Sequence, residues 1–551
     1  MIKRLALLVF MLLVSVPVFA ETVDTAWVRR YNGPGDGEDE ASAIAVDGSG
    51  NVYVTGFSSG GYDTTGLLTY EDFATIKYYP NGDTAWVRRY NGPGYGSDGA
   101  SSIAVDDSGN VYVTGFSLGG YDTAGALTYQ DFATIKYYPN GDTAWLRRYN
   151  GPANWYDEAT AIAVDNSGNV YVTGRSWGNG TSEDFCTIKY DSSGNELWVK
   201  RYAGVTMGDD GANAMTLDGS GNLYVTGDSY GSGTGADYAT IKYYPNGDTA
   251  WVRRYNGPGN WTDWASAITV DRYCNVYVTG RSDQIKGNPD YCTIKYDSSG
   301  NQLWVVNYNG TGNYGDIAEA IAVDSLGNVY VTGTSPESSS YPYNYHYITI
   351  KYYPNGDTVW VRRYNGSGNG NDRAYALAID GSGNVYVTGT SGTIKYGADG
   401  SQLWFEQLGG FDIAVDGSDN IYVTGTDFGY VTIKYIQKRD DVADEPEEKE
   451  KPCEFALSQN YPNPFNPATL IPFTVHGEQK TVNSPIRTTL TIYNILGQKV
   501  RTLVDEDKVP GEYQVVWDGK DDSGKEVGSG IYFYRLKVGD FSETKRSVLL
   551  K

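Results

Sequence analysis

Histidine and cysteine are scarce in this chain of 551 residues, which has two of the first and four of the second. The histidines are His346 and His476, and the cysteines are Cys186, Cys274, Cys292 and Cys453. Their positions offer no Ser-His-Asp, Cys-His or HExxH arrangement in the first 436 residues, and four distant cysteines make neither a metal set nor a disulfide framework. We therefore expect no cofactor, and the sequence points to no catalytic or metal-binding residue. A calcium ion is the alternative, but the DGSGN segments lack the alternating oxygen series of a calcium loop.

Positive charge and long apolar runs are also lacking. The formal net charge is −24, which argues against nucleic acid or an anionic membrane as a main partner. The longest apolar run, from Leu5 to Val16, follows Lys3 and Arg4 and precedes Val18-Phe19-Ala20. It is shorter than the ~20 residues of a membrane-spanning helix. Residues 1–20 therefore predict a secretory signal peptide rather than an anchor, and we expect no transmembrane span after them.

A repeated phrase, NVYVTG, dominates what is present. Its central tyrosines are spaced by 59, 59, 53, 53, 53, 56 and 36 residues, at Tyr53, Tyr112, Tyr171, Tyr224, Tyr277, Tyr330, Tyr386 and Tyr422. Each copy follows an IAVD-like strand and precedes a TIKY strand and a WVRRY strand, with tight-turn residues between them. Apolar groups alternate onto both faces, so each sheet must be covered on both sides. The pattern predicts an all-β fold of four-stranded propeller blades.

The two ends of the repeat region complement each other. The segment from Asp24 to Tyr31 is a WVRRY strand without a preceding unit, and the last unit, near Tyr422 and Ile433, has no such strand. We therefore predict that the N-terminal strand completes the last blade and closes the ring. Eight IAVD-like strands predict eight blades. Seven is the alternative, because the last two units are short.

The units resemble the bacterial β-propeller repeats called SBBP repeats in their IAVD, GNVYVTG and DFATIKY strands, over residues 21–436. The resemblance implies the fold and an extracytoplasmic location, without a common activity. Residues 437–455 are charged, contain two prolines and predict a solvated linker.

Residues 456–551 contain short apolar runs separated by turn clusters, which predict a small Ig-like β-sandwich. They resemble the C-terminal sorting domain of type IX secretion cargo in five features that come in the expected order: Asn460 to Thr469, Ile492 to Gln498, Trp517 to Gly519, Ser529 to Tyr534 and a basic-apolar end from Lys545 to Lys551. This resemblance implies recognition by outer-membrane secretion machinery and a secreted or cell-surface location. A sandwich that merely packs on the propeller is the alternative, and an insertion at 477–489 departs from the pattern.

The connections expected on one face of the propeller are long and variable, so we place any function there. Two sets of residues lie in these connections. The first is an aspartate five residues before the IAVD-like strand in seven units: Asp39, Asp98, Asp157, Asp210, Asp263, Asp316 and Asp372. These carboxylates could bind a cation, but a structural role, in which each accepts backbone N–H bonds, is favoured. A second series, Asp72, Asp131, Asp184, Asp237 and Asp290, has the same structural interpretation.

The second set is aromatic. The candidate ligand-binding residues are Trp155, Trp177, Trp261, Trp264, Tyr62 and Tyr121. Such rings stack on sugars, anchor a protein partner or only fill gaps between loops. Our first hypothesis is a secreted or cell-surface propeller that binds a glycan or a protein. The alternatives are an extracellular polysaccharide hydrolase or lyase with carboxylates on the long-loop face, and a structural or adhesion component.

Overall fold

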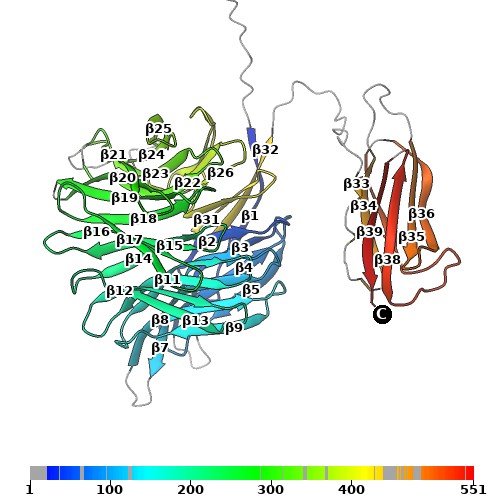
Figure 1. Cartoon of the computed structure of the whole chain (residues 1–551), viewed down its shortest axis with the longest axis horizontal. Coiled ribbons are helices and arrows are strands. Elements are labelled where there is room, and N and C mark those ends of the chain that lie inside the picture. The colour runs from blue at the N-terminus through cyan, green and yellow to red at the C-terminus, as the bar shows by residue number, and fades with distance from the viewer. Residues whose placement is uncertain are drawn as a thin grey trace, which may run out of the picture. The chain divides into compact units, whose positions relative to one another are not determined.

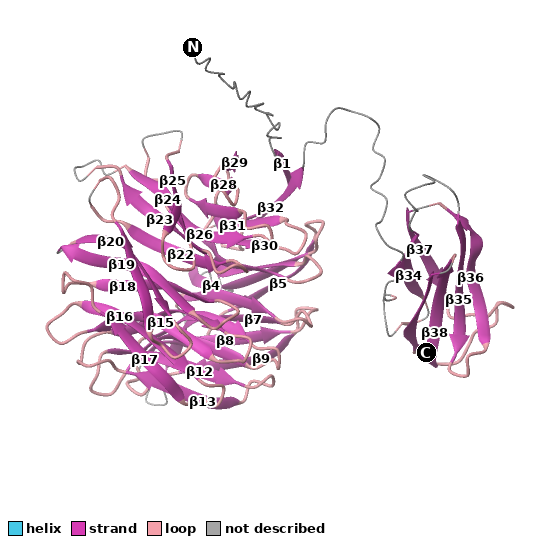
Figure 2. Cartoon of the chain, turned by 45° about the horizontal axis from the view of Figure 1, so that its top comes forward, coloured by secondary structure: helices cyan, strands magenta, loops and turns pink. Residues whose placement is uncertain are grey.

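The computed structural model describes residues 22–550 apart from several short segments, which are 36, 63–67, 95, 122–126, 286, 313, 339–343, 367–369, 427–428, 439–455, 458–459, 461–464, 467, 476–485, 510 and 540. The predicted signal peptide and most of the predicted linker therefore lie outside the described residues. The chain divides into two compact units, Met1–Asp440 and Asp441–Lys551. Every regular element of the described residues is a strand (Figure 2). Among those residues, no helix is long and apolar enough to cross a membrane.

The first unit contains eight four-stranded antiparallel sheets, each one blade of a propeller. Seven blades are continuous in sequence. Blade 1 is β2 (Asp39–Val46), β3 (Val52–Tyr62), β4 (Leu68–Tyr78) and β5 (Thr84–Tyr90); blade 2 is β6 (Asp98–Val105), β7 (Val111–Tyr121), β8 (Leu127–Tyr137) and β9 (Thr143–Tyr149); blade 3 is β10 (Asp157–Val164), β11 (Val170–Trp177), β12 (Glu183–Tyr190) and β13 (Glu196–Tyr202); blade 4 is β14 (Asp210–Leu217), β15 (Leu223–Tyr230), β16 (Ala236–Tyr243) and β17 (Thr249–Tyr255). Blade 5 is β18 (Asp263–Val270), β19 (Val276–Ile285), β20 (Asn288–Tyr296) and β21 (Gln302–Tyr308); blade 6 is β22 (Ile317–Val323), β23 (Val329–Pro336), β24 (Tyr345–Tyr352) and β25 (Thr358–Tyr364); blade 7 is β26 (Ala374–Ile379), β27 (Val385–Gly389), β28 (Gly392–Tyr396) and β29 (Gln402–Glu406).

Blade 8 joins the two ends of the unit. Strands β30 (Asp412–Val415), β31 (Ile421–Thr426) and β32 (Tyr430–Lys438) are completed by β1 (Thr22–Tyr31), which lies against β32 in Figure 1. Val28 pairs with Ile433 and Trp27 with Lys434. The predicted closure and the count of eight blades are confirmed, and the alternative count of seven is wrong.

The innermost strand of each blade begins earlier than predicted. In blade 1 it begins at Asp39 rather than Ile44, and its register with β3 shifts between Ala41 and Ala43. A β-bulge of this kind breaks the apolar alternation from which strands are recognised in sequence. The bulge also explains the glycine of NVYVTG, because a Cβ on Gly56 would lie 2.0 Å from the Glu40 carbonyl oxygen.

The turn between the first two strands of each blade is built around one aspartate. In blade 1, Asp47 Oδ1 accepts the backbone N–H groups of Ser49 and Asn51 at 2.9 Å, and Oδ2 accepts from the Asn51 amide and the Tyr53 hydroxyl at 2.7 and 2.8 Å. Gly50 provides the left-handed residue, with φ of 76°. Burial alone would raise the pKa of Asp47, but these hydrogen bonds outweigh it and lower that pKa. The carboxylate therefore fixes both the turn and the buried tyrosine.

Neighbouring blades are joined by the same tryptophan hydrogen bond at seven of the eight junctions. Between blades 7 and 8 the Trp404 ring packs in the same way, but its indole N–H has no hydrogen-bond partner among the described residues. Trp86 of β5 lies between Tyr53 of its own blade and Tyr137 of the next, with ring centroids 6.4 and 5.9 Å apart, and its indole N–H donates to the Pro139 carbonyl at 3.1 Å. Lys77 of β4 donates to that carbonyl at 3.3 Å. Trp27 of β1 makes the equivalent bond to Pro80 O at 3.0 Å, so the closing strand also packs on blade 1.

The second unit is a β-sandwich. One sheet is β33 (Ala456–Leu457), β34 (Thr469–Val475) and β37 (Gly511–Trp517); the other is β36 (Lys499–Lys508), β35 (Ile486–Asn494), β38 (Gly530–Val538) and β39 (Phe541–Leu549). Trp517 is fully buried, 5.3 Å from the Phe465 ring and 5.0 Å from the Tyr532 ring. Asn460 is also buried and donates to Thr469 Oγ1 at 2.9 Å. The described parts of the motif from Asn460 to Thr469 are therefore packed into this sandwich.

Candidate functional site

The seven aspartates before the IAVD-like segments are buried; five of them are the first residue of a strand, whereas Asp316 and Asp372 lie one and two residues before theirs. They are between 0 and 4% exposed. Asp39 accepts the Gly33 N–H at 2.8 Å and the Ser59 N–H at 3.0 Å. Five others accept from the glycine six residues earlier, and Asp210 accepts from Tyr230 N at 3.0 Å. These bonds pin the preceding connection to the second strand, which is a structural role.

The second series of aspartates forms ion pairs with the second arginine of WVRRY. Asp72, Asp131, Asp184 and Asp237 contact Arg89, Arg148, Arg201 and Arg254 at 2.7–2.8 Å. Blade 5 departs from this arrangement, because Asn307 occupies the arginine position. There, burial, Asp316 and Asp283 raise the pKa of Asp290 to about 6. Its Oδ1 is buried without a hydrogen-bond partner among the described residues.

Trp155 and Trp177 are brought together in an aromatic platform. We define this platform as Tyr129, Trp155, Tyr156 and Trp177, from blades 2 and 3 and the connection between them. The Trp155 ring centroid lies 3.9 Å from Tyr129, 5.8 Å from Tyr156 and 6.2 Å from Trp177. Trp155 and Tyr156 are 38% and 44% exposed. The platform therefore presents adjacent rings to solvent on the long-loop side of the propeller.

Local backbone geometry presents Trp155. The preceding Asn154 is left-handed, with φ of 51°, and its side chain accepts from the Asn150 amide at 2.5 Å. The same sequence, NGP-x-NW, recurs before Trp261, where Asn260 has φ of 53°. Asparagine tolerates this conformation better than most residues do. Trp261 is 41% exposed. Tyr129 and Tyr156 were missed by the sequence analysis, although Tyr156 directly follows a nominated tryptophan.

The other nominated aromatics are placed differently from the prediction. Trp264 is not in a loop but in β18, and its ring lies between Arg175 at 5.1 Å and Arg281 at 5.4 Å. This cation–π sandwich covers a ring that was expected to be available. Tyr62 and Tyr121 end β3 and β7, and their side chains lie outside the described part of the structure.

A cavity of about 500 Å³ lies where blade 8 meets blade 1, on the same side as the platform. Glu38, Asp39, Glu40, Phe57 and Thr426 are among the residues that line it. Burial and the Glu38 charge raise the pKa of Glu40. The cavity thus holds carboxylates beside an aromatic ring. Within the described segments, no group of three or more His, Cys, Asp or Glu side chains is arranged to hold a metal ion.

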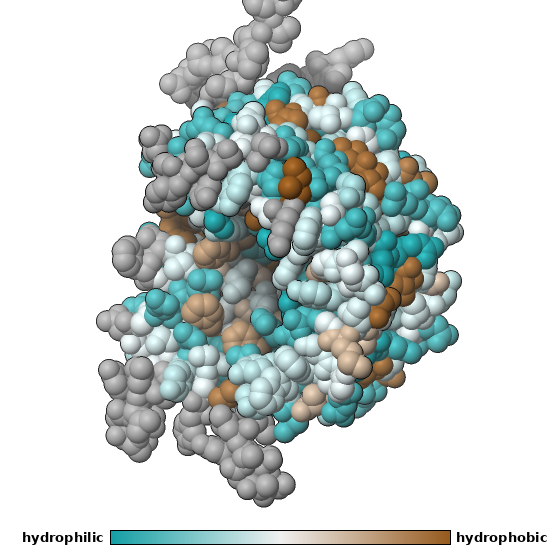
Figure 3. Space-filling view, turned by 90° about the vertical axis from the view of Figure 1, so that its left-hand side faces the viewer, coloured by the Kyte–Doolittle hydropathy of each residue, from teal (hydrophilic) through white to brown (hydrophobic). Residues whose placement is uncertain are grey.

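Hydrophobic side chains are scattered over the face of the molecule shown in Figure 3, and that face is mostly hydrophilic with a hollow near its middle. The described residues of this face therefore form no broad apolar surface on which a partner could dock. Small groups of exposed rings, such as the aromatic platform, are a more specific feature.

Comparison with known proteins supports the two-part organisation. Five segments, 26–63, 85–122, 145–180, 308–337 and 359–393, match the β-propeller repeat model named SBBP. Residues 475–540 match the FlgD Ig-like domain. The eight sheets and these matches define the class: an eight-bladed β-propeller with SBBP repeats, followed by an Ig-like domain.

A curated relative is an uncharacterized WD repeat-containing protein of Acanthamoeba polyphaga mimivirus, 24% identical over 427 residues. The alignment covers 64% of this chain but only 29% of that protein. Among solved structures, a Dos1 propeller is 8% identical with a TM-score of 0.45, over 74% of this chain and 95% of that one. PorZ, a surface component of the type IX secretion system of Porphyromonas gingivalis, is 14% identical with a TM-score of 0.39, over 93% and 70%.

Proposed function

We propose that this protein is a secreted or cell-surface binding protein whose propeller recognises a glycan through the aromatic platform. The observation that carries the proposal is the placement of three rings within 6.2 Å of the Trp155 ring, with Trp155 and Tyr156 each more than one third exposed. Flat exposed rings stack on the apolar faces of sugars, and their polar surroundings satisfy hydroxyl groups. Glu183 and Arg175, which pair at 3.5 Å, supply such groups next to Trp177.

The test is to measure binding of the full chain to a panel of polysaccharides and to compare Trp155→Ala with Trp261→Ala. Both tryptophans follow a left-handed asparagine and are similarly exposed, but Trp155 belongs to the described platform. Loss of a central aromatic contact typically weakens binding about tenfold or more. We expect this loss for Trp155→Ala and little change for Trp261→Ala. Equal effects, or no glycan binding, would contradict the assignment, and binding of a protein instead would replace it.

The proposed location rests on the signal peptide and on the sorting-domain motifs of residues 456–551, which we propose to be read by outer-membrane secretion machinery. One feature of the second unit fits recognition by a partner. Ile495 and Leu496, at the turn between β35 and β36, are 68% and 76% exposed. Asn494 Oδ1 holds this turn by accepting the N–H groups of Leu496 and Gln498 at 3.0 Å.

Export can be tested without unfolding the domain. We expect Leu496→Asp to retain the protein in the periplasm of an organism with type IX secretion, as removal of residues 456–551 should. Leu326→Asp is the control, because Leu326 is an equally exposed turn residue of the propeller. Normal export of the truncated chain would refute the sorting function, and normal export of Leu496→Asp alone would refute the role of this turn.

The seam cavity supports a second candidate, a polysaccharide hydrolase or lyase. Glu40 has a raised pKa and lies beside Glu38 and Phe57, which is the environment of a carboxyl group that donates a proton. Product release from a polysaccharide that is abolished by Glu40→Gln would favour this candidate. Binding without turnover would exclude it for the glycans used.

A further inference from the structure

A pocket recurs on the opposite side of the propeller, between the first turns of neighbouring blades. Its lining is mostly polar between blades 2 and 3 and between blades 7 and 8, whereas Leu326 and Ile379 add apolar surface between blades 6 and 7. It has a volume of about 310 Å³ between blades 2 and 3, about 210 Å³ between blades 6 and 7 and about 260 Å³ between blades 7 and 8. The first volume is at the lower end of the range of small-molecule sites, about 300–1,000 Å³. We call these three spaces the inter-turn pockets. They were not foreseen from the sequence, which directed attention to the long loops.

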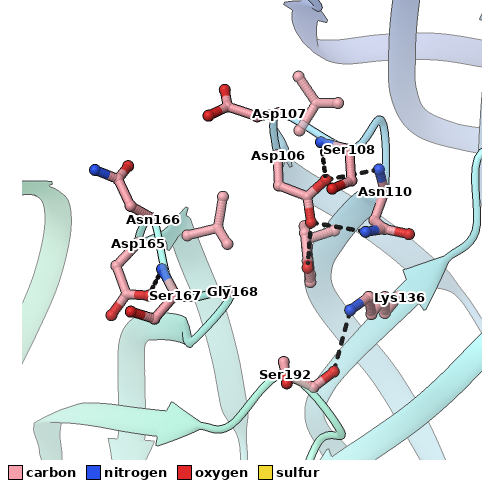
Figure 4. Close-up of a pocket in the computed structure, with 13 residues that line it drawn as sticks. Asp106, Asp107, Ser108, Asn110, Lys136, Asp165, Asn166, Ser167, Gly168 and Ser192 are labelled. Carbon is pink, nitrogen blue, oxygen red and sulfur yellow. Dashed lines mark hydrogen bonds between the residues drawn. The ribbon is translucent and has the colours of Figure 1, made fainter. Parts of the chain in front are cut away.

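Each inter-turn pocket is lined by the same kinds of group. In the first, the Asp106 and Asp165 turns stand on two sides, and Lys136 and Ser192 lie below them in the view of Figure 4. The two carboxylates are engaged within their own turns; Asp106 accepts four hydrogen bonds of 2.8–2.9 Å. These bonds hold the pocket walls in place and use the hydrogen-bonding sites of the carboxylates, while the negative charge of the carboxylates remains. Lys351 and Lys395 occupy the position of Lys136 in the other two pockets.

The lysine is the unusual member of the lining. Lys136 is 7% exposed, and its ammonium group lies 5.0 Å from the Tyr112 ring centroid and donates to the Ser192 carbonyl at 3.1 Å. An ammonium group has three N–H donors, so this bond leaves donor capacity toward the pocket. The hydroxyls of Ser108 and Ser167, at the rim, have no hydrogen-bond partner among the described residues. Donors and acceptors therefore face the same small space.

This lining selects against most ligand classes. Three carboxylates, those of Asp106, Asp107 and Asp165, oppose an anion such as phosphate, and the Lys136 ammonium opposes a simple cation. The Lys136 ammonium covers the Tyr112 ring, and although Val105 and Val164 also line the pocket, most of its lining groups are polar or charged, so a hydrophobic ligand finds little apolar surface there. A neutral molecule with many hydroxyl groups can accept from the lysine and serines and donate to the serine hydroxyls and the Asp107 carboxylate.

We propose that the inter-turn pockets bind units of a neutral saccharide. Their recurrence around one face suits a polymer, since several weak contacts to one chain combine into strong attachment when their spacing matches. The proposal does not depend on the aromatic platform, which belongs to the other side of the propeller.

The experiment uses the full chain and calorimetric titration with four probes: cello-, manno- and chito-oligosaccharides, which are neutral, and oligogalacturonate, which is acidic. Ser167→Tyr fills the first pocket, and Ser382→Tyr fills the other two, because Ser382 lines both. Both serines are exposed, so the fold should be retained. Ser523→Tyr is the matched control, in an equivalent turn of the second unit where Ser523 N donates to Asp521 at 2.9 Å.

We expect at least one neutral probe to bind, the Ser167→Tyr/Ser382→Tyr variant to lose that binding, and Ser523→Tyr and Trp155→Ala to retain it. Lys136→Met/Lys351→Met, which keeps the shape of the pockets, should weaken binding about tenfold by removing charge-assisted hydrogen bonds. Binding of no neutral probe, a preference for oligogalacturonate, or unchanged binding in the filled variant would overturn the proposal. Loss of binding in Trp155→Ala alone would instead assign the saccharide to the aromatic platform.

Discussion

Trp27 provides the most direct test of ring closure, because the chain contains an internal control for it. Trp27 and Trp86 occupy the same position in blades 8 and 1, and both are 7% exposed. Each donates its indole N–H to a proline carbonyl of the next blade, at 3.0 and 3.1 Å. Each also lies 5.9 Å from a tyrosine ring of that blade. Trp27 belongs to the first strand of the described chain, whereas Trp86 lies within a continuous repeat.

If the ring is closed as described, replacing either tryptophan with alanine removes the same packing and the same hydrogen bond. Truncation of a buried tryptophan costs about 3–5 kcal/mol of unfolding free energy, and we expect this loss for both Trp27→Ala and Trp86→Ala. Denaturation by guanidinium should be followed by circular dichroism, since the chain has 13 tryptophans and fluorescence would average over them. A second readout is faster amide exchange in β32 for Trp27→Ala. A loss below about 1 kcal/mol for Trp27→Ala, with a full loss for Trp86→Ala, would refute closure by β1.

Two further predictions concern positions where one blade departs from the others. Asp290 lacks the arginine that Asp237 has, and its pKa is raised to about 6, so its ionisation opposes folding above that pH. Between pH 3.8, the pKa of the unfolded carboxyl group, and about pH 6, the folded state holds a proton on Asp290 that the unfolded state has released. The free energy of unfolding should therefore fall as the pH rises through this window. Asp290→Asn should therefore raise the melting temperature at pH 8 and have little effect on it at pH 4. Asp237→Asn should lower the melting temperature at pH 8. Destabilisation by both substitutions at pH 8 would contradict this reasoning. Cys274 has φ of 61° at a turn position where six other blades have glycine and blade 8 has Asp419, also with φ of 61°. Cys274→Gly should therefore stabilise the protein by about 1 kcal/mol in thermal denaturation, and Gly221→Ala, in the same turn of blade 4, should destabilise it by a similar amount. No gain from Cys274→Gly would show that the turn bears no strain.

The blades were predictable because the apolar alternation and the turn residues of each unit agree, and because the unpaired strands at the two ends are complementary. Asp47 and Gly50 illustrate this, since the aspartate recurs in the first turn of every unit and the glycine in six of the eight. The sequence pattern did not predict that the first five residues of β2 belong to the strand, and the reason also lies in the local sequence. A β-bulge at Ala41 interrupts the alternation there, and nothing in the sequence marks a bulge except the glycine opposite it.

The candidate sites were less predictable because they depend on contacts between units. Trp264 and Trp155 both lie at positions that are not tryptophan in most of the other repeats, and the sequence alone gives no reason to distinguish them. Only the neighbouring blade places Arg175 over one ring, and only the adjacent strand places Tyr129 against the other. The inter-turn pockets are a stronger case. Their lining residues are the regular ones of the repeat, which pattern analysis assigns to turns, and the pocket exists only when two turns stand side by side.

The pairing of β1 with β32 also imposes an order on folding. Strand β1 precedes the rest of the propeller in sequence and pairs with β32, about 400 residues later. During synthesis from N- to C-terminus, β1 must therefore wait, with Trp27 unpacked, until nearly the whole unit has been made. The other seven sheets can form as they emerge, whereas this long-range contact is the slowest kind to establish. Completion of the eighth sheet thus reports that the entire ring has been assembled.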